Sequence, residues 1–214
     1  ATFATLPLPG IQPCIMDNDG NELNILNVEG RLCIKFPWPS MARTIYGDHK
    51  RFKDTYFSTF ENMYFTGDGC IRDNEGMYRI TGRVDDVIIV SGHNLGTAEI
   101  ESAIDEHPNV CETAIVGYPH KIKGNAIYAF VITQGDIKNE INTKAEINNL
   151  IVKNVGPIAK VEKIQFVKGL PKTRSGKIMR RILRKVASND FSNFGDTSTL
   201  LDPNVVEEII REKI

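Results

Sequence analysis

Four short segments combine residue types that can bind or activate a phosphorylated ligand. In residues 66–69, Asp68 lies between two glycines that let a ligand approach the backbone, and its carboxylate can accept two hydrogen bonds from a vicinal diol such as a ribose. Arg83 follows a glycine and can present its planar guanidinium to a phosphate or ribose oxygen. Each has a plainer alternative: an ordinary Gly-Asp-Gly turn, and a surface arginine paired with Asp85 or Asp86.

Two further segments adjoin predicted helices. Residues 91–99 join a strand to a helix, where a glycine-containing loop can receive a ligand against backbone N–H groups, although the spacing is not that of a P-loop. Lys177 follows a Ser-Gly pair, and its long stem suits contact with negative charge developing on a phosphate or carboxylate. The alternatives are a plain strand-to-helix turn and a solvated basic helix.

Composition narrows the class of protein. The chain has 214 residues, 41% of them hydrophobic, which is enough for a packed core. Its 26 basic and 27 acidic residues give a net charge of -1, which argues against a general polyanion binder. Four widely spaced cysteines show no zinc-ligand spacing, so we expect reduced thiols and a cytoplasmic location, with nucleus or organelle as alternatives.

The elements that must position these segments change in kind near Gly82. Before it, short strands alternate with turns, which favours a β-barrel-like subdomain or a meander. We predict strands at residues 11–16, 31–36, 63–66 and 77–80. We place the domain boundary at Asp85-Asp86, because Gly82 frees the backbone and two carboxylates are unfavourable to bury together. The predicted domains are therefore residues 1–84 and 85–214.

The second domain reads as a small α+β domain with a two- to three-stranded sheet and covering helices. Val87 begins a buried strand, and Thr97 opens a helix that Pro108 stops. Strands are expected at residues 114–117, 126–133 and 163–167, with helices at 144–155, 177–187 and after residue 203. The helix at 177–187 has an apolar stripe (Ile178, Ile182, Val186) opposite four cations, Arg180, Arg181, Arg184 and Lys185.

The order of these segments resembles the adenylate-forming superfamily, whose members activate a carboxylate with ATP. Residues 52–64, 91–104, 124–130 and 195–200 narrow the resemblance to the AMP-forming acetyl-CoA synthetases, and it covers essentially the whole chain. The motifs that carry it are Thr66-Gly67-Asp68, Gly82-Arg83-Val84-Asp85-Asp86 and Pro171-Lys172-Thr173-Arg174-Ser175-Gly176-Lys177.

This resemblance implies two half-reactions. Acetate attacks the α-phosphate of Mg-ATP to give acetyl-adenylate and pyrophosphate, and the CoA thiol then displaces AMP. Asp68 would hold the ribose hydroxyls, Arg83 would contact the nucleotide, and Lys177 would reach the reacting carboxylate and α-phosphate. Asp85 would be the hinge about which a mobile C-terminal domain reorients between the two steps.

The resemblance also implies a CoA site. Ser91 and Gly92 would face the nucleotide site in the second step, with Gly92 leaving room for the pantetheine arm. Asn94 and Val152 occupy positions where the family usually has arginines, for the nucleotide phosphates and a CoA phosphate, so those two contacts are open. Lys153 adjoins Val152, but neighbouring residues on a helix point in different directions.

A cation site is implied where the helix runs into Pro108. Unpaired carbonyls near Asp105, His107 and Val110 could bind it, and a helix end capped by water is the equal alternative. The implied ligands are therefore ATP or AMP, CoA and Mg²⁺, with acetate as the acyl substrate.

The resemblance implies that the family's phosphate loop, adenine-binding segment and acetate pocket would precede Ala1. We therefore expect a C-terminal fragment that is inactive alone and needs a missing N-terminal domain. Lys177 is also a candidate target for a lysine acetyltransferase and deacetylase, because acetylation would remove its charge. Two alternatives are a propionyl- or other short-chain acyl-CoA synthetase, and a non-catalytic regulatory module that uses the basic helix. We expect neither nucleic acid nor membrane as a partner of the enzyme.

Overall fold

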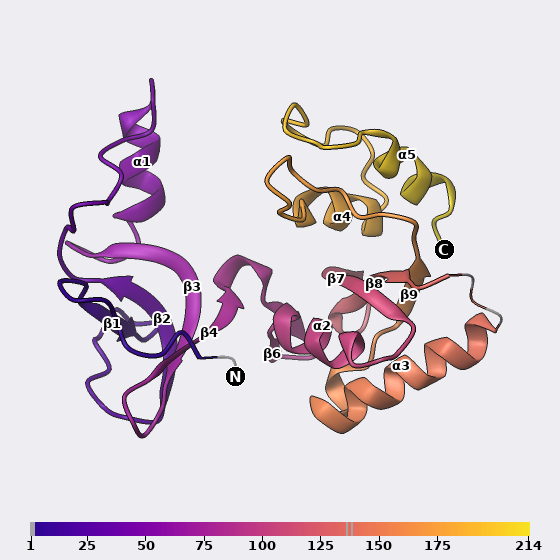
Figure 1. Cartoon of the computed structure of the whole chain (residues 1–214), viewed down its shortest axis with the longest axis horizontal. Coiled ribbons are helices and arrows are strands. Elements are labelled where there is room, and N and C mark those ends of the chain that lie inside the picture. Colours follow the sequence, from indigo (N-terminus) through magenta and orange to yellow (C-terminus); the bar gives the residue numbers. More distant parts are fainter. Residues whose placement is uncertain (1–2, 136, 138) are drawn as a thin grey trace. The chain divides into compact units, whose positions relative to one another are not determined.

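The computed structural model describes residues 3–135, 137 and 139–214. The chain divides into two compact units, Ala1–Asp85 and Asp86–Ile214, and Figure 1 shows the elements of each. The predicted domains, residues 1–84 and 85–214, divide the chain one residue earlier, and their assignment stays a prediction.

The first unit is built on a four-stranded antiparallel sheet in the order β1-β2-β3-β4. Helix α1 (His49–Tyr56) begins after Asp48, whose carboxylate accepts a hydrogen bond from the N–H of Arg51. The strands are β1 (Pro13–Met16), β2 (Val28–Ile34), β3 (Tyr64–Arg72) and β4 (Tyr78–Arg83). A small core gathers Cys14, Met16, Cys33 and Phe60.

This sheet is open. In the part of the chain that the structure describes, β1 and β4 are its edges and do not pair with each other, so the expectation of a β-barrel-like subdomain is wrong. Asp17 and Asp73 each accept backbone N–H groups two and four residues further on, which closes the turns expected there.

The second unit contains a five-stranded sheet in the order β6-β5-β8-β7, with β9 parallel to β8. The expected two to three strands are too few, because a short hairpin, β5 and β6, extends the sheet through the single pair Val90–Gly124. The strands are β5 (Ile88–Val90), β6 (His93–Leu95), β7 (Val110–His120), β8 (Gly124–Thr133) and β9 (Lys163–Phe166).

Helices cover both faces of this sheet (Figure 1). Alternate residues of β8 serve the two faces: Ile127 and Ala129 pack with one cluster, and Tyr128 and Phe130 with the other. The first cluster includes α2 (Thr97–Asp105) and α3 (Glu140–Asn154), and the second includes α4 (Arg180–Ala187) and α5 (Asn204–Arg211). Short 3-10 turns occupy Val84–Asp86 and Pro157–Ala159.

A buried polar contact fastens α5 to the sheet. The Tyr128 hydroxyl donates to Oε1 of Gln165 at 2.7 Å, and Nε2 of Gln165 donates to the carbonyl of Ile209 at 2.9 Å. Burial raises the pKa of Tyr128 to about 12. None of the helices described is long and apolar enough to cross a lipid bilayer.

Candidate functional site

The sheet of the first unit places Asp68 and Arg83 opposite each other on β3 and β4. Nη1 of Arg83 lies 3.4 Å from Oδ1 of Asp68 and donates to the carbonyl of Thr66 at 3.1 Å. The side chains are 51% exposed for Arg83 and 30% for Asp68, so both reach solvent while paired. Two residues predicted separately for a nucleotide site therefore form one polar group that a ligand can approach.

Glycines allow this pairing. Gly67 has a φ of +80°, and a Cβ there would lie 2.6 Å from Nη2 of Arg83. A Cβ at Gly69 would lie 2.6 Å from Oγ1 of Thr81. The glycines that we expected to admit a ligand thus first make room for side chains of the neighbouring strand.

The carboxylates at the unit boundary have different partners. Oδ1 of Asp85 accepts a hydrogen bond from Nε of Arg83 at 3.0 Å, and the Asp85 side chain is 65% exposed. Asp86 is only 11% exposed and accepts a hydrogen bond at 2.9 Å from Arg184 of α4. Asp86 is therefore fixed within the second unit, whereas Asp85 belongs to the surface of the first.

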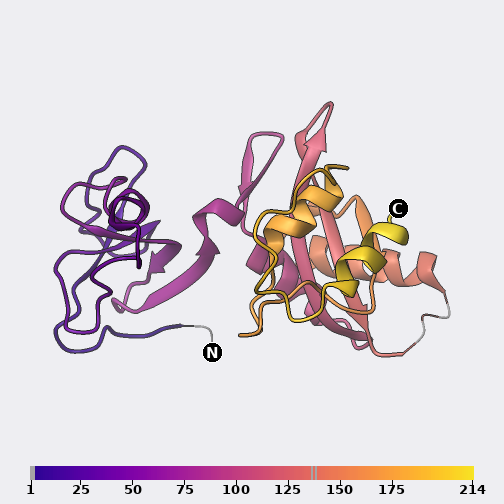
Figure 2. The same ribbon diagram turned by 90° about the horizontal axis from the view of Figure 1, so that it is seen from above.

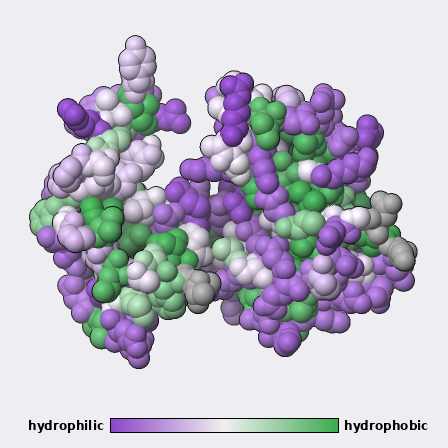
Figure 3. Space-filling view, viewed as in Figure 1, coloured by the Kyte–Doolittle hydropathy of each residue, from purple (hydrophilic) through white to green (hydrophobic). Residues whose placement is uncertain are grey.

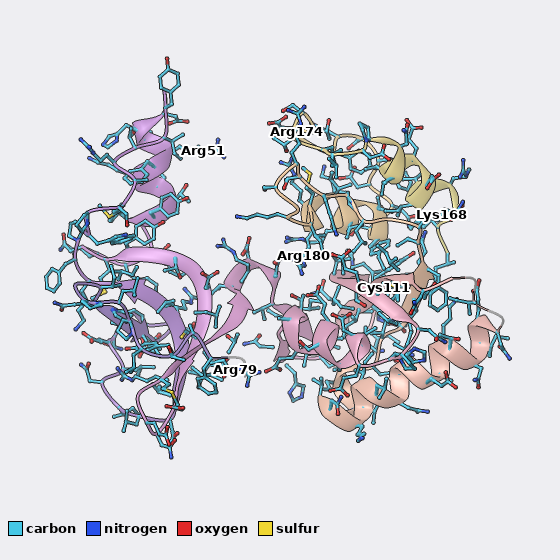
Figure 4. All side chains as sticks on the ribbon, viewed as in Figure 1. Arg51, Arg79, Cys111, Lys168, Arg174 and Arg180 are labelled. Carbon is cyan, nitrogen blue, oxygen red and sulfur yellow. The ribbon has the colours of Figure 1, made fainter. Side chains whose placement is uncertain are left out.

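Lys177 closes a tight turn before α4. The N–H of Gly176 donates to the carbonyl of Thr173 at 2.9 Å, and the N–H of Thr173 donates to the carbonyl of Lys177 at 2.8 Å. The N–H of Lys177 adds a bond of 3.1 Å to Oγ1 of Thr173. Gly176 adopts φ +84°, which glycine tolerates. The side chains of Arg174 and Lys177 are exposed, and Figure 4 shows Arg174 at the outer edge of the unit.

The polar tail anchors one side of this turn. The N–H of Leu201 donates to the carbonyl of Lys172 at 2.9 Å, and the N–H of Arg174 donates to the carbonyl of Thr199 at 3.1 Å. The Lys172 ammonium also lies 2.7 Å from the carboxylate of Glu112. The segment at residues 199–201 thus supports the lysine turn.

A buried ion pair anchors the other side. Nη2 of Arg180 donates to both carboxylate oxygens of Glu101 at 2.8 Å each, and the N–H of Ile115 donates to Oε1 at 2.9 Å. The side chains are only 13% exposed for Glu101 and 25% for Arg180. Burial raises the pKa of the Glu101 carboxyl, against the lowering effect of Arg180 and Ile115. In Figure 4, Arg180 lies between α4 and α2.

The position of Arg180 corrects an expectation. The sequence places it on the solvent face of the helix, opposite an apolar stripe whose members Ile182 and Val186 are indeed buried. The structure turns Arg180 inward instead, because Glu101 needs a partner there. The helix also begins at Arg180 rather than at Lys177.

The other cations of α4 also have partners within the chain. Lys185 lies 3.1 Å from the Asp190 carboxylate, Arg181 donates to the carbonyl of Asp196, and Arg184 pairs with Asp86. The basic cluster is therefore largely engaged internally, which weakens its interpretation as a surface for polyanions.

Residues 91–99, expected as one loop from a strand to a helix, instead hold the turn and second strand of the β5–β6 hairpin and the start of α2. Ser91 and Gly92 make a two-residue turn between β5 and β6, with positive φ values of +49° and +84°. A Cβ at Gly92 would meet no atom within 4 Å, so the space beside this turn is open. Asn94 lies on β6 with its side chain exposed.

The end of α2 only partly fits a cation. The buried His107 ring is engaged at both nitrogens: Nε2 lies 3.1 Å from the Glu146 carboxylate, and Nδ1 accepts the N–H of Asn109 at 3.2 Å. The His107 carbonyl accepts the N–H of Val110. Backbone carbonyls, or the Asp105 carboxylate whose pKa burial raises, are left as ligands. The described residues hold no cluster of three or more His, Cys, Asp or Glu side chains suited to a metal.

Lys153 and Val152 have different surroundings on α3. Val152 is 39% exposed. Lys153 instead borders a hollow of about 430 Å³ between α3 and the end of α2, which is lined by His107, Pro108, Glu146, Asn149, Leu150 and Lys153. Lys153 therefore does not take the direction of Val152, in keeping with helical geometry.

Sequence reasoning did not find Glu101 as a site-supporting residue. The sequence feature that could have indicated it is the position of Glu101 beside the apolar stripe of α2, where Ile100, Ala103 and Ile104 are at most 2% exposed. A charge at that place requires a partner, but the partner is 79 residues away in sequence.

Comparisons with known proteins show which family of enzymes this chain resembles. Residues 99–177, from the first turn of α2 to Lys177, match the family described as the AMP-binding enzyme C-terminal domain. The whole chain is also 57% identical, over 213 residues, to the acetyl-coenzyme A synthetase of Escherichia coli K12. Over its whole length, the chain is therefore homologous to part of the acetyl-coenzyme A synthetases. It spans 32% of the length of that relative.

Solved structures agree with the fold. The acetoacetyl-CoA synthetase from Streptomyces lividans superposes with a TM-score of 0.84 at 21% identity, covering 98% of this chain and 32% of that one. The ATP-bound MatB from Rhodopseudomonas palustris gives a TM-score of 0.72 at 26% identity, covering 86% of this chain and 35% of that one.

Proposed function

We propose that this chain supplies the C-terminal part of an AMP-forming acetate–CoA ligase. The reaction would proceed as acetate plus ATP to acetyl-adenylate and pyrophosphate, and then CoA to acetyl-CoA and AMP. The observation that carries the proposal is the exposed Lys177 ammonium on a turn braced by the tail and by the Arg180–Glu101 pair. A cation held in this way can stabilise charge that develops on the α-phosphate.

The first unit would contribute the nucleotide contacts. Asp68 would accept hydrogen bonds from the ribose hydroxyls, and the half-exposed Arg83 would turn part of its guanidinium to the nucleotide. Asn94 would offer an uncharged hydrogen bond to a phosphate. Asp85 would be the hinge, since it is surface-exposed and the next residue, Asp86, is fixed to α4.

The second unit would also serve the CoA step. Ser91 and Gly92 would border the passage for the pantetheine arm, because the space beside Gly92 is open. Val152 would lie near a CoA phosphate without a charged contact. Mg²⁺ would enter with ATP, and a further cation at the end of α2 would use the carbonyls at Asp105 and Val110 rather than the His107 ring.

The first unit has surface for an N-terminal partner domain. Leu6, Leu8 and Ile25 are 67%, 76% and 64% exposed. Figure 3 shows apolar patches over this unit on the face in view. Such exposure suits burial against further protein. Lys177 would also be open to acetylation, which would abolish its charge.

The test is a pair of half-reaction assays on the full-length protein. We expect acetate-dependent exchange between ATP and pyrophosphate, and CoA-dependent release of AMP from acetyl-adenylate. Running the exchange with propionate defines the acyl range. Absence of exchange with every short carboxylate would reject the proposal.

A further inference from the structure

The turn that joins β7 to β8 is organised around one imidazole ring. Nδ1 of His120 accepts the N–H groups of Ile122 and Lys123, each at 3.2 Å. Because Nδ1 can accept only when it carries no proton, His120 holds its proton on Nε2. Nε2 lies 3.5 Å from the Glu162 carboxylate, which favours that tautomer.

This turn in turn holds the β5–β6 hairpin. The carbonyl of Lys123 accepts the N–H of Ser91 at 2.9 Å, and Val90 pairs with Gly124. Nδ2 of Asn125 donates to the carbonyl of Ile89 at 3.2 Å. Figure 2 shows the β7–β8 hairpin projecting from the body of the unit. The two hairpin tips are therefore joined at the Ser91 turn.

The Ser91 turn needs such support. Ser91 adopts φ +49°, a left-handed conformation that residues other than glycine rarely take. The bond from its N–H to Lys123 fixes this conformation from outside the hairpin. If the His120 turn opens, the Lys123 carbonyl moves and Ser91 loses that bond.

We propose that His120 is a positioning residue for the CoA-dependent half-reaction, acting through Lys123 on the Ser91-Gly92 turn. The inference rests on the proposed function, which places this turn beside the pantetheine arm. We expect His120 to have no part in adenylate formation, because the partners described for its ring are Ile122, Lys123 and Glu162, and none of them belongs to the Lys177 turn.

Two variants of the full-length protein separate positioning from a general structural role. His120→Leu removes the acceptor, whereas His120→Asn retains a side-chain oxygen that can accept from N–H groups two and three residues on. We expect His120→Leu to slow CoA-dependent AMP release by about tenfold, as loss of two neutral hydrogen bonds allows, and His120→Asn to restore it. Adenylate formation should be unchanged in both. His49→Leu, which removes a 3.0 Å contact to Thr44 in the first unit, is the control.

A second polar variant keeps the test decisive if His120→Leu fails to fold. The side-chain amide of Asn lies near the position of Nδ1, whereas that of Gln lies near Nε2, so His120→Gln stays polar but loses the acceptor for Ile122 and Lys123. We expect His120→Gln to slow the CoA step and to accelerate amide exchange at Ser91, and His120→Asn to do neither. Equal losses in both half-reactions, an unchanged CoA step in His120→Leu, or the same CoA step in His120→Gln and His120→Asn would overturn the inference. Wild-type protein without either half-reaction would instead refute the proposed function.

Discussion

We predict that breaking the Arg180–Glu101 ion pair strongly lowers the free energy of unfolding, and that removing the second charge restores most of it. Arg180→Met leaves the Glu101 carboxylate, 13% exposed, without its charged partner. Removing one member of a buried pair in this way costs about 3–5 kcal/mol in the free energy of unfolding. The N–H of Ile115, 2.9 Å from Oε1, would remain and offset a small part of that loss.

Removing the second charge should recover most of the loss. In Glu101→Gln/Arg180→Met no charge is buried, so we expect it to be more stable than Arg180→Met by about 2 kcal/mol or more. Lys50→Met is the control, because Lys50 and its partner Asp54 are 86% and 57% exposed. That exposed i,i+4 pair should change stability by no more than about 0.5 kcal/mol.

Urea unfolding followed by two probes locates the effect. Far-ultraviolet circular dichroism reports mainly the second unit, which holds α2 to α5, while the single tryptophan, Trp38, reports the first. We expect Arg180→Met to lower the urea midpoint measured by circular dichroism and to leave the midpoint measured by Trp38 fluorescence unchanged. The reasoning would be refuted if the loss of unfolding free energy in Glu101→Gln/Arg180→Met equalled the sum of the losses in the two single variants. It would also be refuted if Arg180→Met were as stable as the wild type.

Acidification should reduce the destabilisation of Arg180→Met. Burial already raises the pKa of Glu101 in the native state, so the folded chain binds this proton at a higher pH than the unfolded chain does. The contribution of this carboxyl to stability therefore falls as pH rises through the raised pKa. In Arg180→Met the pKa rises further, so the destabilisation should be full near neutral pH and shrink toward about pH 4.

Three other predictions address separate parts of the molecule. Gly67→Ala should destabilise the first unit by about 1 kcal/mol more than Gly76→Ala, measured by tryptophan fluorescence; both glycines have φ +80°, but only the Cβ at Gly67 would meet the Arg83 guanidinium, at 2.6 Å. Equal losses would contradict this. Gln165→Met should cost about 2–3 kcal/mol by circular dichroism, because the buried O–H of Tyr128 loses its acceptor and the carbonyl of Ile209 loses its donor; a neutral effect would show that the network is dispensable. The 214-residue chain alone should show no acetate-dependent ATP–pyrophosphate exchange, and exchange at an enzyme-like rate would refute that.

Regular patterns made much of the fold predictable. The apolar strand near Val90 and the helix between Thr97 and Pro108 follow from periodicity and end signals, and the structure places β5 and α2 there. Helix α1 is missing from the sequence prediction, because its single buried residue, Phe52, makes no apolar stripe. Strand β6 is hidden by its three-residue length within a glycine-containing segment.

The sequence names the candidate site residues, whose roles remain predictions, but it does not give their arrangement. The residue types of Asp68 and Arg83 indicate which ligand groups they could bind. Their pairing with each other depends on the register of β3 and β4. The inward turn of Arg180 depends on Glu101, 79 residues earlier, and no local pattern reports such a distant partner. No local pattern in the sequence indicates that Nδ1 of His120 accepts hydrogen bonds from two backbone N–H groups.

The most direct test of the account is the division of half-reactions in Lys177→Ala, made in the full-length protein beside Lys168→Ala, an exposed lysine of the same unit (Figure 4). We expect Lys177→Ala to slow adenylate formation by at least about a hundredfold, since a placed cation contributes about 3 kcal/mol to such a transition state. It should leave the conversion of supplied acetyl-adenylate and CoA nearly unchanged, and Lys168→Ala should affect neither step. Full adenylation activity in Lys177→Ala, or an equal loss in both steps, would contradict the account.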